Sequence, residues 1–416
     1  MKGPYTAKEN GRVEYNGNKI FSKIDNIFDH KYPTNEVMER VNQFKNEKMW
    51  THISNINHRI NISANNYFDE MGAKYTTLPL TTRMISSPGA VYGKEAISYT
   101  TDTSPITLKW FKEKKNAFLS ESSQIYLELA LMQDEINHVY SIYNSFRKEE
   151  ADPTHLSEFH HIEYEGNVNQ KKNKKIALGM VSRIIEDLLI KNERDLEYFL
   201  DEKKINNLAD LSLYIQDIPK ITFREALDVL YEDTKNDIYK KFSMNGNFGS
   251  WEEVRLTEIY NNMVAISQFP LLEVPFYHAM VDNVEEKWTE LNFKKTNSSY
   301  NHPTSPEFIL ESNYNMVSKE KSSKVANCAD FIWPGYREFI GSGHRVRSIS
   351  ELEEKAEIFD LPRNDYKPYL QSRELPGYEV SSGFGMGWER LVQGLLEMPF
   401  IWTASQFPRG HTTLKP

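Results

Sequence analysis

The chain has 416 residues, of which 39% are hydrophobic and 26% charged, and its 50 Lys and Arg against 59 Asp and Glu give a formal charge of −9. This composition excludes a disordered or collagen-like chain and provides for one large domain or two ordinary ones. The acidic balance excludes a global positive field that would attract nucleic acid or an anionic membrane. Cys328 is the only cysteine, which excludes an internal disulfide framework and favours a reducing compartment.

The first 47 residues are polar and show little periodicity, so we expect an N-terminal extension rather than a domain. They lack the apolar core of a signal peptide, and no segment approaches the roughly 18 apolar residues of a membrane span. We therefore expect a cytoplasmic protein without a membrane partner. Apolar residues then recur at helical spacing over 48–70 and predict a helix, followed by a strand over 74–80.

Strand-like segments at 95–100 and 104–110 precede an amphipathic helical pattern at 122–132. Two alternating segments, 138–149 and 157–165, follow on either side of a turn and predict an antiparallel pair.

Side chains of a strand alternate between its two faces, so residues two apart share a face. Arg147 and Glu149 share a face of the first strand, and the second strand has Phe159, His161 and Glu163 on one face. If the two faces coincide, the pair is either a solvated surface with ion pairs or the floor of a site for a base and a phosphate or carboxylate. The alternation alone leaves both interpretations open.

The second half of the chain begins with apolar residues three and four apart between about 166 and 280, which predict a helical insertion. Residues 293–325 are rich in Ser, Asn and Lys and predict a long loop. A strand-rich stretch over 326–347 and a further helix lead to a strand, a glycine turn and a helix near the C-terminus.

Three glycines two apart, Gly383, Gly385 and Gly387, come just before Arg390 at the start of the last of these helices. They leave one face of a strand without side chains, so a flat ligand can lie against the backbone below the guanidinium. Their spacing does not fit the dinucleotide fingerprint, and no Gly-Lys-Ser/Thr follows as in a phosphate loop.

These blocks together carry a resemblance to a family. Motifs 1, 2 and 3 of class II aminoacyl-tRNA synthetases resemble GAKYTTLPL, FRKEEADPTHLSEFHHIE and GFGMGWERL of this chain. The aspartyl/asparaginyl branch is similar at FLSESSQIYLE, PKITFREAL, ADFIWPGYREFIGSGHR and QFPR. The resemblance implies an α+β fold with a mostly antiparallel sheet flanked by helices, a catalytic domain over 48–416 and a homodimer.

The resemblance also implies a site for ATP and Mg²⁺. Arg147 would bridge the α-phosphate and the reacting carboxylate, and Phe159 and Arg390 would enclose the adenine. The expected ATP contacts are Arg147, Glu149, His155, Phe159, Gly387 and Arg390, with Arg147 and Arg390 as the catalytic pair. The expected substrate contacts are Gln124, Glu128, His161, Glu163 and Arg345. Asp330 and Glu338 match the family's acidic metal ligands.

Two departures from the family bear on function. The 47 residues before motif 1 are too few for the five-stranded anticodon-binding barrel of the branch. The motif 2 loop has no arginine between Lys148 and His155, which removes cations for RNA phosphates. We therefore expect no tRNA partner, and predict an AMP-forming ligase that adenylates the side-chain carboxylate of aspartate or an aspartate-like residue and transfers the acyl group to ammonia, as asparagine synthetases do.

In that reaction Arg345 would hold the α-carboxylate of aspartate while the β-carboxylate meets ATP at Arg147. Three alternatives remain: an asparaginyl-tRNA synthetase, an ATP-dependent ligase that turns an amide into a nitrile or builds a natural product, and an inactive regulatory paralogue. The joint retention of Arg147, Glu149, Arg390, Asp330 and Glu338 argues against the inactive paralogue.

Overall fold

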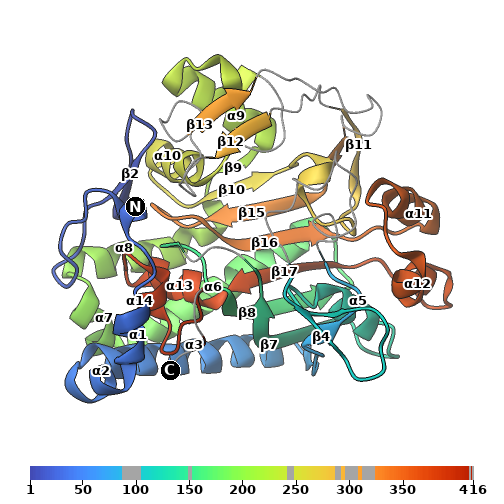
Figure 1. The fold of residues 1–416 in the computed structure, drawn as a ribbon, viewed down its shortest axis with the longest axis horizontal. Helices are drawn as coiled ribbons and strands as arrows, with labels where there is room; N and C mark the ends of the chain where they lie inside the picture. Colours follow the sequence, from blue (N-terminus) through green and yellow to red (C-terminus); the bar gives the residue numbers. More distant parts are fainter. Residues whose placement is uncertain are drawn as a thin grey trace.

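The computed structural model describes residues 1–86, 105–148, 152–240, 248–285, 292–295, 308–311, 324–411 and 414. An eight-stranded sheet crosses the middle of the molecule, with helices below it and at both ends (Figure 1). Its strands in spatial order are β3 (Lys74–Tyr75), β7 (His138–Phe146), β8 (Glu158–Gly166), β17 (Ser382–Gly387), β16 (Glu338–His344), β15 (Cys328–Ile332), β10 (Val264–Ser267) and β9 (Lys220–Thr222). Only the outermost pairs, β3 with β7 and β10 with β9, are parallel, so the expected mostly antiparallel α+β fold is confirmed.

The predicted antiparallel pair is β7 and β8, and its register brings the two polar faces together. Ser145 lies opposite Phe159, Tyr143 opposite His161, and Ser141 opposite Glu163. Directly paired residues of an antiparallel ladder point to the same face. The side chains of β8 that we singled out from the sequence therefore share one face of the sheet with alternate residues of β7.

The opposite face of the sheet is covered by the long helices α3 (Met49–Glu70) and α6 (Gln170–Lys191). In α3 the buried residues Ile53, Ile56, Ile60, Ala64 and Phe68 follow helical spacing, which confirms the helix expected over 48–70. The Phe68 ring stacks on the rings of Tyr140 and Tyr164, at centroid distances of 4.5 and 5.8 Å. The apolar residues of β8 thus face the helices, and its polar residues face the other way.

The region over 166–280 is largely helical but also contributes two strands to the sheet. Its other helices are α7 (Glu193–Phe199), α8 (Glu202–Tyr214), α9 (Phe223–Thr234) and α10 (Ser250–Tyr260). The strands β9 and β10 lie between them and form the edge of the sheet. Strands of three and four residues are too short to interrupt a helical periodicity, so the sequence did not reveal them.

Much of the predicted loop over 293–325 lies outside the described residues, as does the predicted strand over 95–100. The described parts contain β12 (Asn292–Lys295) paired with β13 (Phe308–Glu311), of which only the backbone is described, and β14 (Lys324–Ala326) paired with β11 (Met280–Glu285). A small sheet of β4 (Thr81–Thr82), β6 (Ala117–Leu119) and β5 (Thr107–Leu108) precedes the helix α5 (Gln124–Ala130).

The first residues pack against the rest of the protein and contain short elements. These are β1 (Tyr5–Ala7), β2 (Val13–Tyr15), α1 (Thr34–Met38) and α2 (Arg40–Asn46). Tyr5 and Tyr15 are buried, and the Tyr15 hydroxyl donates to the carbonyl oxygen of Glu397 over 2.6 Å. The Tyr5 ring lies 4.6 Å from that of Tyr336. The segment read as an extension therefore contributes to the core.

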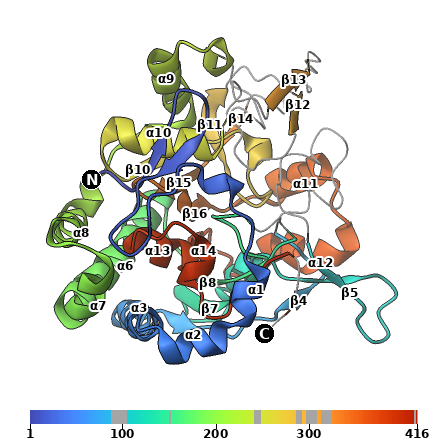
Figure 2. The same ribbon diagram turned by 60° about the vertical axis from the view of Figure 1, so that its left-hand side comes forward.

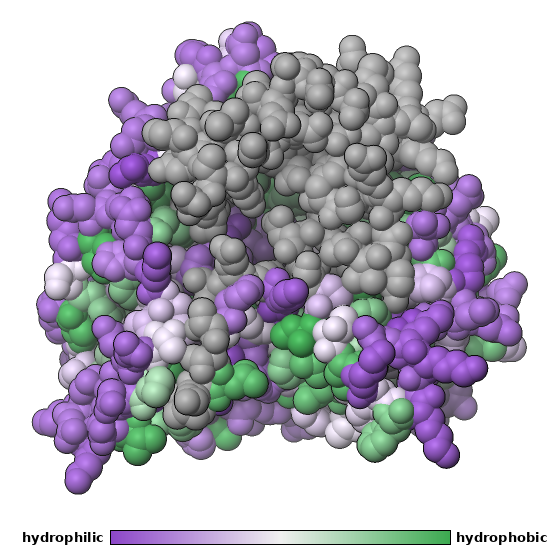
Figure 3. All heavy atoms as spheres, in the orientation of Figure 1, coloured by the Kyte–Doolittle hydropathy of each residue, from purple (hydrophilic) through white to green (hydrophobic). Residues whose placement is uncertain are grey.

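Four further helices complete the chain: α11 (Ile349–Ile358), α12 (Arg363–Gln371), α13 (Trp388–Leu395) and α14 (Ile401–Ala404). In Figure 2, α11 and α12 lie to the right of the sheet, whereas α13 and α14 lie side by side near the centre of the view. Hydrophilic residues dominate the lower left and right of the face drawn in Figure 3, with smaller hydrophobic groups between them. Among the described residues, we find no helix with both the length and the apolar character needed to cross a membrane.

Candidate active site

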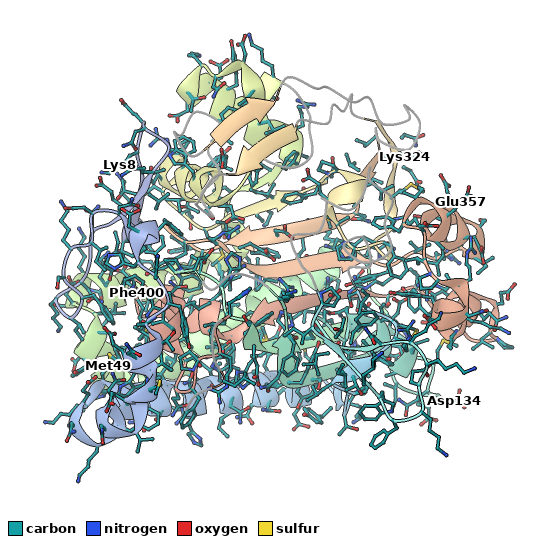
Figure 4. The ribbon with its side chains drawn as sticks, in the orientation of Figure 1. Lys8, Met49, Asp134, Lys324, Glu357 and Phe400 are labelled. Atoms are coloured by element: carbon teal, nitrogen blue, oxygen red, sulfur yellow. The ribbon has the colours of Figure 1, made fainter. Side chains whose placement is uncertain are left out.

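A cavity of about 300 Å³ opens on the face of the sheet that α3 and α6 leave uncovered, and a smaller pocket of about 80 Å³ adjoins it. The strands β8, β17 and β16 contribute lining residues such as Glu163, Gly385 and Glu338. The labelled residues Lys8, Asp134 and Glu357 lie at the rim of the molecule (Figure 4). Six residues line both spaces: Arg147, His155, His161, Glu338, Gly385 and Arg390. The two spaces therefore form one continuous candidate active site.

The glycines of β17 make room for the polar side chains of β8. Gly383 pairs with Glu165 and Gly385 with Glu163. A β-carbon on Gly383 would collide with the Glu165 carboxylate and the Gln124 amide, and one on Gly385 would lie 3.3 Å from a Glu163 oxygen. The bare strand face predicted from the glycine spacing is confirmed, and buried carboxylates already occupy part of it.

Two arginines from distant parts of the chain line the cavity together. Arg147 follows the end of β7, and its guanidinium lies 5.2 Å from the centre of the Phe159 ring. Arg390 belongs to α13 and donates to the backbone oxygen of Glu338 over 2.6 Å. Phe159 and Gly387 line the smaller pocket with both arginines, and Glu149 lies outside the described residues.

His161 lies between these arginines and the interior of the sheet. Its Nδ1 lies 2.7 Å from the Ser145 hydroxyl, and the residue is buried. Burial and the positive charges of Arg147 and Arg390 hold the pKa of His161 well below its usual range. A neutral imidazole therefore lines the cavity at this point.

Glu163 and Gln124 place oxygen atoms in the deeper part of the cavity. Glu163 is buried and accepts hydrogen bonds from the Ser122 and Tyr143 hydroxyls, both over 2.6 Å. Burial raises the pKa of Glu163 to about 7, although these two hydrogen bonds act in the opposite direction. Gln124 donates through Nε2 to the Tyr164 carbonyl over 2.7 Å and to Glu165 over 2.5 Å, so its Oε1 remains the end able to accept a proton donor.

The sequence pointed to Arg345 but not to the carboxylate that pairs with it. Arg345 lines the cavity as expected, but its guanidinium is bound by Glu165, with Nε 3.0 Å from Oε1 and Nη2 2.7 Å from Oε2. Both residues are almost completely buried, and Ser381 donates to Glu165 over 2.7 Å. Glu165 continues the alternation of Phe159, His161 and Glu163 by one step, which was the signal that could have identified it.

Nη1 of Arg345 is buried and has no hydrogen-bond partner among the described residues. An unpaired buried donor is costly, and a ligand oxygen would satisfy it.

Glu128 lies outside the lining of this cavity among the described residues. It forms an ion pair with Arg373 and accepts a hydrogen bond from Tyr369 over 2.6 Å. Glu128 is buried beside α12, where its carboxylate has partners from the protein. The structure thus brings Gln124, His161, Glu163 and Arg345 together and separates Glu128 from them.

Asp330 and Glu338 come together on neighbouring strands. A β-carbon on Gly341 would lie 3.0 Å from an oxygen of Glu338 and 3.6 Å from one of Asp330, so both carboxylates converge on one point. Burial and the charges of Glu338 and Glu253 raise the pKa of Asp330 well above its usual range. Two converging hard oxygen donors suit a magnesium ion that shares its ligands with phosphates, although Glu338 also lies 3.7 Å from Nη1 of Arg390. The described residues contain no group of three or more His, Cys, Asp or Glu side chains that could hold a metal ion.

The comparisons with known proteins agree with this architecture. The family described as class II tRNA synthetases (D, K and N) matches residues 34–411, and the chain belongs to it. An asparagine–tRNA ligase from Koribacter versatilis is 26% identical over 358 residues, which are 85% of this chain and 67% of that protein.

Two solved structures share the fold. One is asparaginyl-tRNA synthetase from Pyrococcus horikoshii complexed with asparaginyl-adenylate, with a TM-score of 0.70 at 24% identity. The match covers 95% of this chain and 77% of the chain of that synthetase. The enzyme from Entamoeba histolytica has a TM-score of 0.69 at 18% identity, with coverages of 93% and 73%.

These findings correct two expectations. The prediction of an ammonia-dependent ligase that works without tRNA was wrong. The prediction that tRNA is not a partner was wrong as well. Both are overturned because the family and the relatives are tRNA-charging synthetases. The aspartate orientation also conflicts with the geometry. Glu165 already neutralises Arg345, so an α-carboxylate placed there would meet a buried like charge.

Proposed function

We propose that this enzyme activates asparagine with ATP to form asparaginyl-adenylate and transfers the asparaginyl group to tRNA. The observation that carries the proposal is the buried pair of Glu165 and Arg345, in which Arg345 lines the cavity and Glu165 balances its charge. The relatives named as asparagine–tRNA ligase and asparaginyl-tRNA synthetase support the same choice of substrate.

The pair suits an uncharged side chain because Glu165 already balances the charge of Arg345. Nη1 of Arg345 can donate to the carbonyl oxygen of a carboxamide. The Glu165 oxygens already accept from Arg345, Ser381 and Gln124, so the pair as a whole is close to neutral, as the carboxamide is. The side-chain carboxylate of aspartate would bring a second negative charge next to Glu165.

The remaining contacts orient the other end of asparagine. Glu163 and the Oε1 atom of Gln124 would accept hydrogen bonds from the α-ammonium group, and Arg147 would bind the α-carboxylate. The adenine would lie between Phe159 and Arg390, with the α-phosphate next to Arg147. A carboxylate oxygen then attacks the α-phosphorus in line, the bond to the bridging oxygen breaks, and pyrophosphate leaves with the electron pair.

Asp330 and Glu338 would hold Mg²⁺, which neutralises phosphate charge when it is bound. Arg147 stabilises the charge that builds on the α-phosphate in the transition state. The neutral His161 beside Arg147 can accept or donate one hydrogen bond without adding charge. No side chain has to act as a nucleophile, because the substrate carboxylate attacks directly.

Exchange of labelled pyrophosphate into ATP tests the choice of substrate. We expect asparagine to support exchange without tRNA, and aspartate to be less efficient by roughly 100-fold or more, since its carboxylate would be buried next to Glu165 without a balancing charge. Aspartate equal to or better than asparagine would refute the amide assignment. No exchange with either amino acid would refute activation altogether.

A further inference from the structure

A cation from an unexpected segment lines the cavity. Arg337 lies in the turn between β15 and β16 and lines the larger cavity together with Asp330, Glu338 and His155. It does not line the smaller pocket, which holds Phe159 and Gly387. The adenine end and the end that contains Arg337 are thus different parts of the site.

The neighbouring loop between β7 and β8 has Arg147 and Lys148 at its start but no further cation before its turn at His155. Between Lys148 and His155 it carries Asp152 and no arginine. Asp152 lies 2.8 Å from Nδ1 of His155 and also accepts a hydrogen bond from the Thr154 amide over 2.7 Å. This loop therefore presents an imidazole fixed by a carboxylate.

Arg337 is held at the cavity by two segments that are distant in the sequence. Its Nε donates to Glu253 of α10 over 3.0 Å, and its Nη1 lies 3.2 Å from Nε2 of His155. A guanidinium group can only donate, so Nε2 of His155 is the acceptor, and the proton on Nδ1 points to Asp152. The contacts of the Arg337 guanidinium thus connect three segments: α10, the β7–β8 loop and the β15–β16 turn.

We propose that Arg337 binds the outer phosphates of ATP and stabilises the departing pyrophosphate. The proposal rests on the use of ATP in the proposed function. When the bond between the α-phosphorus and its bridging oxygen breaks, negative charge moves onto pyrophosphate, and the guanidinium can bind two of its oxygens. Arg337 would thus provide from the β15–β16 turn a positive charge that residues 149–155 of the β7–β8 loop do not contain.

The rival explanation is structural. In that case Arg337 only ties α10 to the β15–β16 turn through Glu253, and the phosphates do not touch it. The two explanations differ in what they predict for ATP and AMP. These ligands share the adenosine and the α-phosphate, but only ATP has the outer phosphates.

Calorimetric binding of ATP and of AMP, each with Mg²⁺ and without amino acid or tRNA, separates the two. For Arg337→Ala we expect the affinity for ATP to fall roughly 10- to 100-fold, as for the loss of hydrogen bonds to a charged group. We expect the affinity for AMP to stay within about twofold, and Arg337→Lys to recover part of the ATP affinity. Equal losses for both ligands, or no loss for ATP, would overturn the proposal.

Arg255→Ala is the matched control. Arg255 lies on α10 and pairs with Asp233 and Glu258, and it is not among the residues that line either pocket. This variant removes an arginine ion pair from the same helix, so it should leave the affinities for both nucleotides unchanged. If it lowered the ATP affinity as much as Arg337→Ala, a general effect on α10 would explain the result and the proposal would fail.

The outcome is independent of the asparagine assignment. A wild-type protein that binds ATP but supports no exchange with asparagine would refute the proposed function and would leave the test of Arg337 intact. Conversely, exchange with asparagine together with unchanged ATP binding in Arg337→Ala would refute only the role of Arg337.

Discussion

At the scale of single residues, the proposed function assigns the choice of side chain to the ion pair of Glu165 and Arg345. Burying two charges is expensive, and a buried pair is often no more stabilising than apolar residues of the same volume. In the proposed function its advantage is specificity, because Nη1 of Arg345 offers a donor whose charge Glu165 already balances. Ser381 and Gln124 add hydrogen bonds to Glu165 and hold the carboxylate in place.

Glu165→Gln is the most direct test of this selectivity. It keeps the shape but leaves Arg345 buried without its counter-charge, so we expect exchange with asparagine to fall by about 100-fold and the preference to shift toward aspartate. Kinetics of pyrophosphate exchange with both amino acids measure the change, and thermal unfolding checks that the variant is folded. Ser381→Ala, which removes one hydrogen bond but keeps the ion pair, should change the preference little. An unaltered preference in Glu165→Gln would remove the pair from substrate recognition.

Glu163 predicts a pH dependence of substrate binding. Because its pKa is raised to about 7, the carboxyl group is protonated below that pH and attracts the α-ammonium of the substrate only weakly. The affinity for asparagine should therefore rise as the pH increases from about 6 to about 8, while the ammonium keeps its charge. Calorimetric titrations across this range measure the effect. In Glu163→Gln the affinity should be low and flat, and a rise of wild-type size in that variant would assign the titration to another group.

At the scale of elements, β17 works as a strand without side chains on one face. Gly383→Ala would push a methyl group into Glu165 and Gln124, whereas a β-carbon at Gly387 would meet only the Arg390 side chain, at 3.8 Å. We expect the first change to cost about 1–3 kcal/mol of unfolding free energy and the second less than 1 kcal/mol. Urea denaturation of both variants measures the difference. Equal stabilities would contradict the close packing of β17 against β8.

The elements also show why the sequence predicted one part of the site and not another. The faces of β7 and β8 followed from alternation with period two, and the glycine strand followed from its spacing. Glu165 was overlooked because the alternation was not continued to the end of β8. Arg337 could not be assigned to the site, because its neighbours His155 and Glu253 are 182 and 84 residues away in sequence.

At the scale of the whole molecule, the first residues belong to the same hydrophobic core as strands β8 and β17. Tyr5 and Tyr15 pack at the C-terminal end of α13, which carries Arg390 at its other end. The polar composition of the first residues predicted an extension, since two tyrosines in a polar segment give no periodic signal. Only the folded structure shows that both tyrosines are buried.

Tyr5→Ala tests this packing. Removing a fully buried ring should destabilise the protein by about 3 kcal/mol or more, because it leaves a cavity next to Tyr15 and Tyr336. Tyr214→Ala is the control, since this tyrosine is 58% exposed and should change the stability little. Urea unfolding followed by tryptophan fluorescence gives both values, and similar stabilities would place residues 1–15 outside the core.

The assignment as a whole predicts that the asparaginyl group ends on RNA. Aminoacylation of total tRNA with labelled asparagine, in the presence of ATP and Mg²⁺, measures this directly. We predict label in acid-precipitable tRNA that is lost on mild alkaline treatment, and none with labelled aspartate. Asparagine-dependent pyrophosphate exchange without any labelled tRNA, under conditions where an authentic asparaginyl-tRNA synthetase charges the same RNA, would contradict the account.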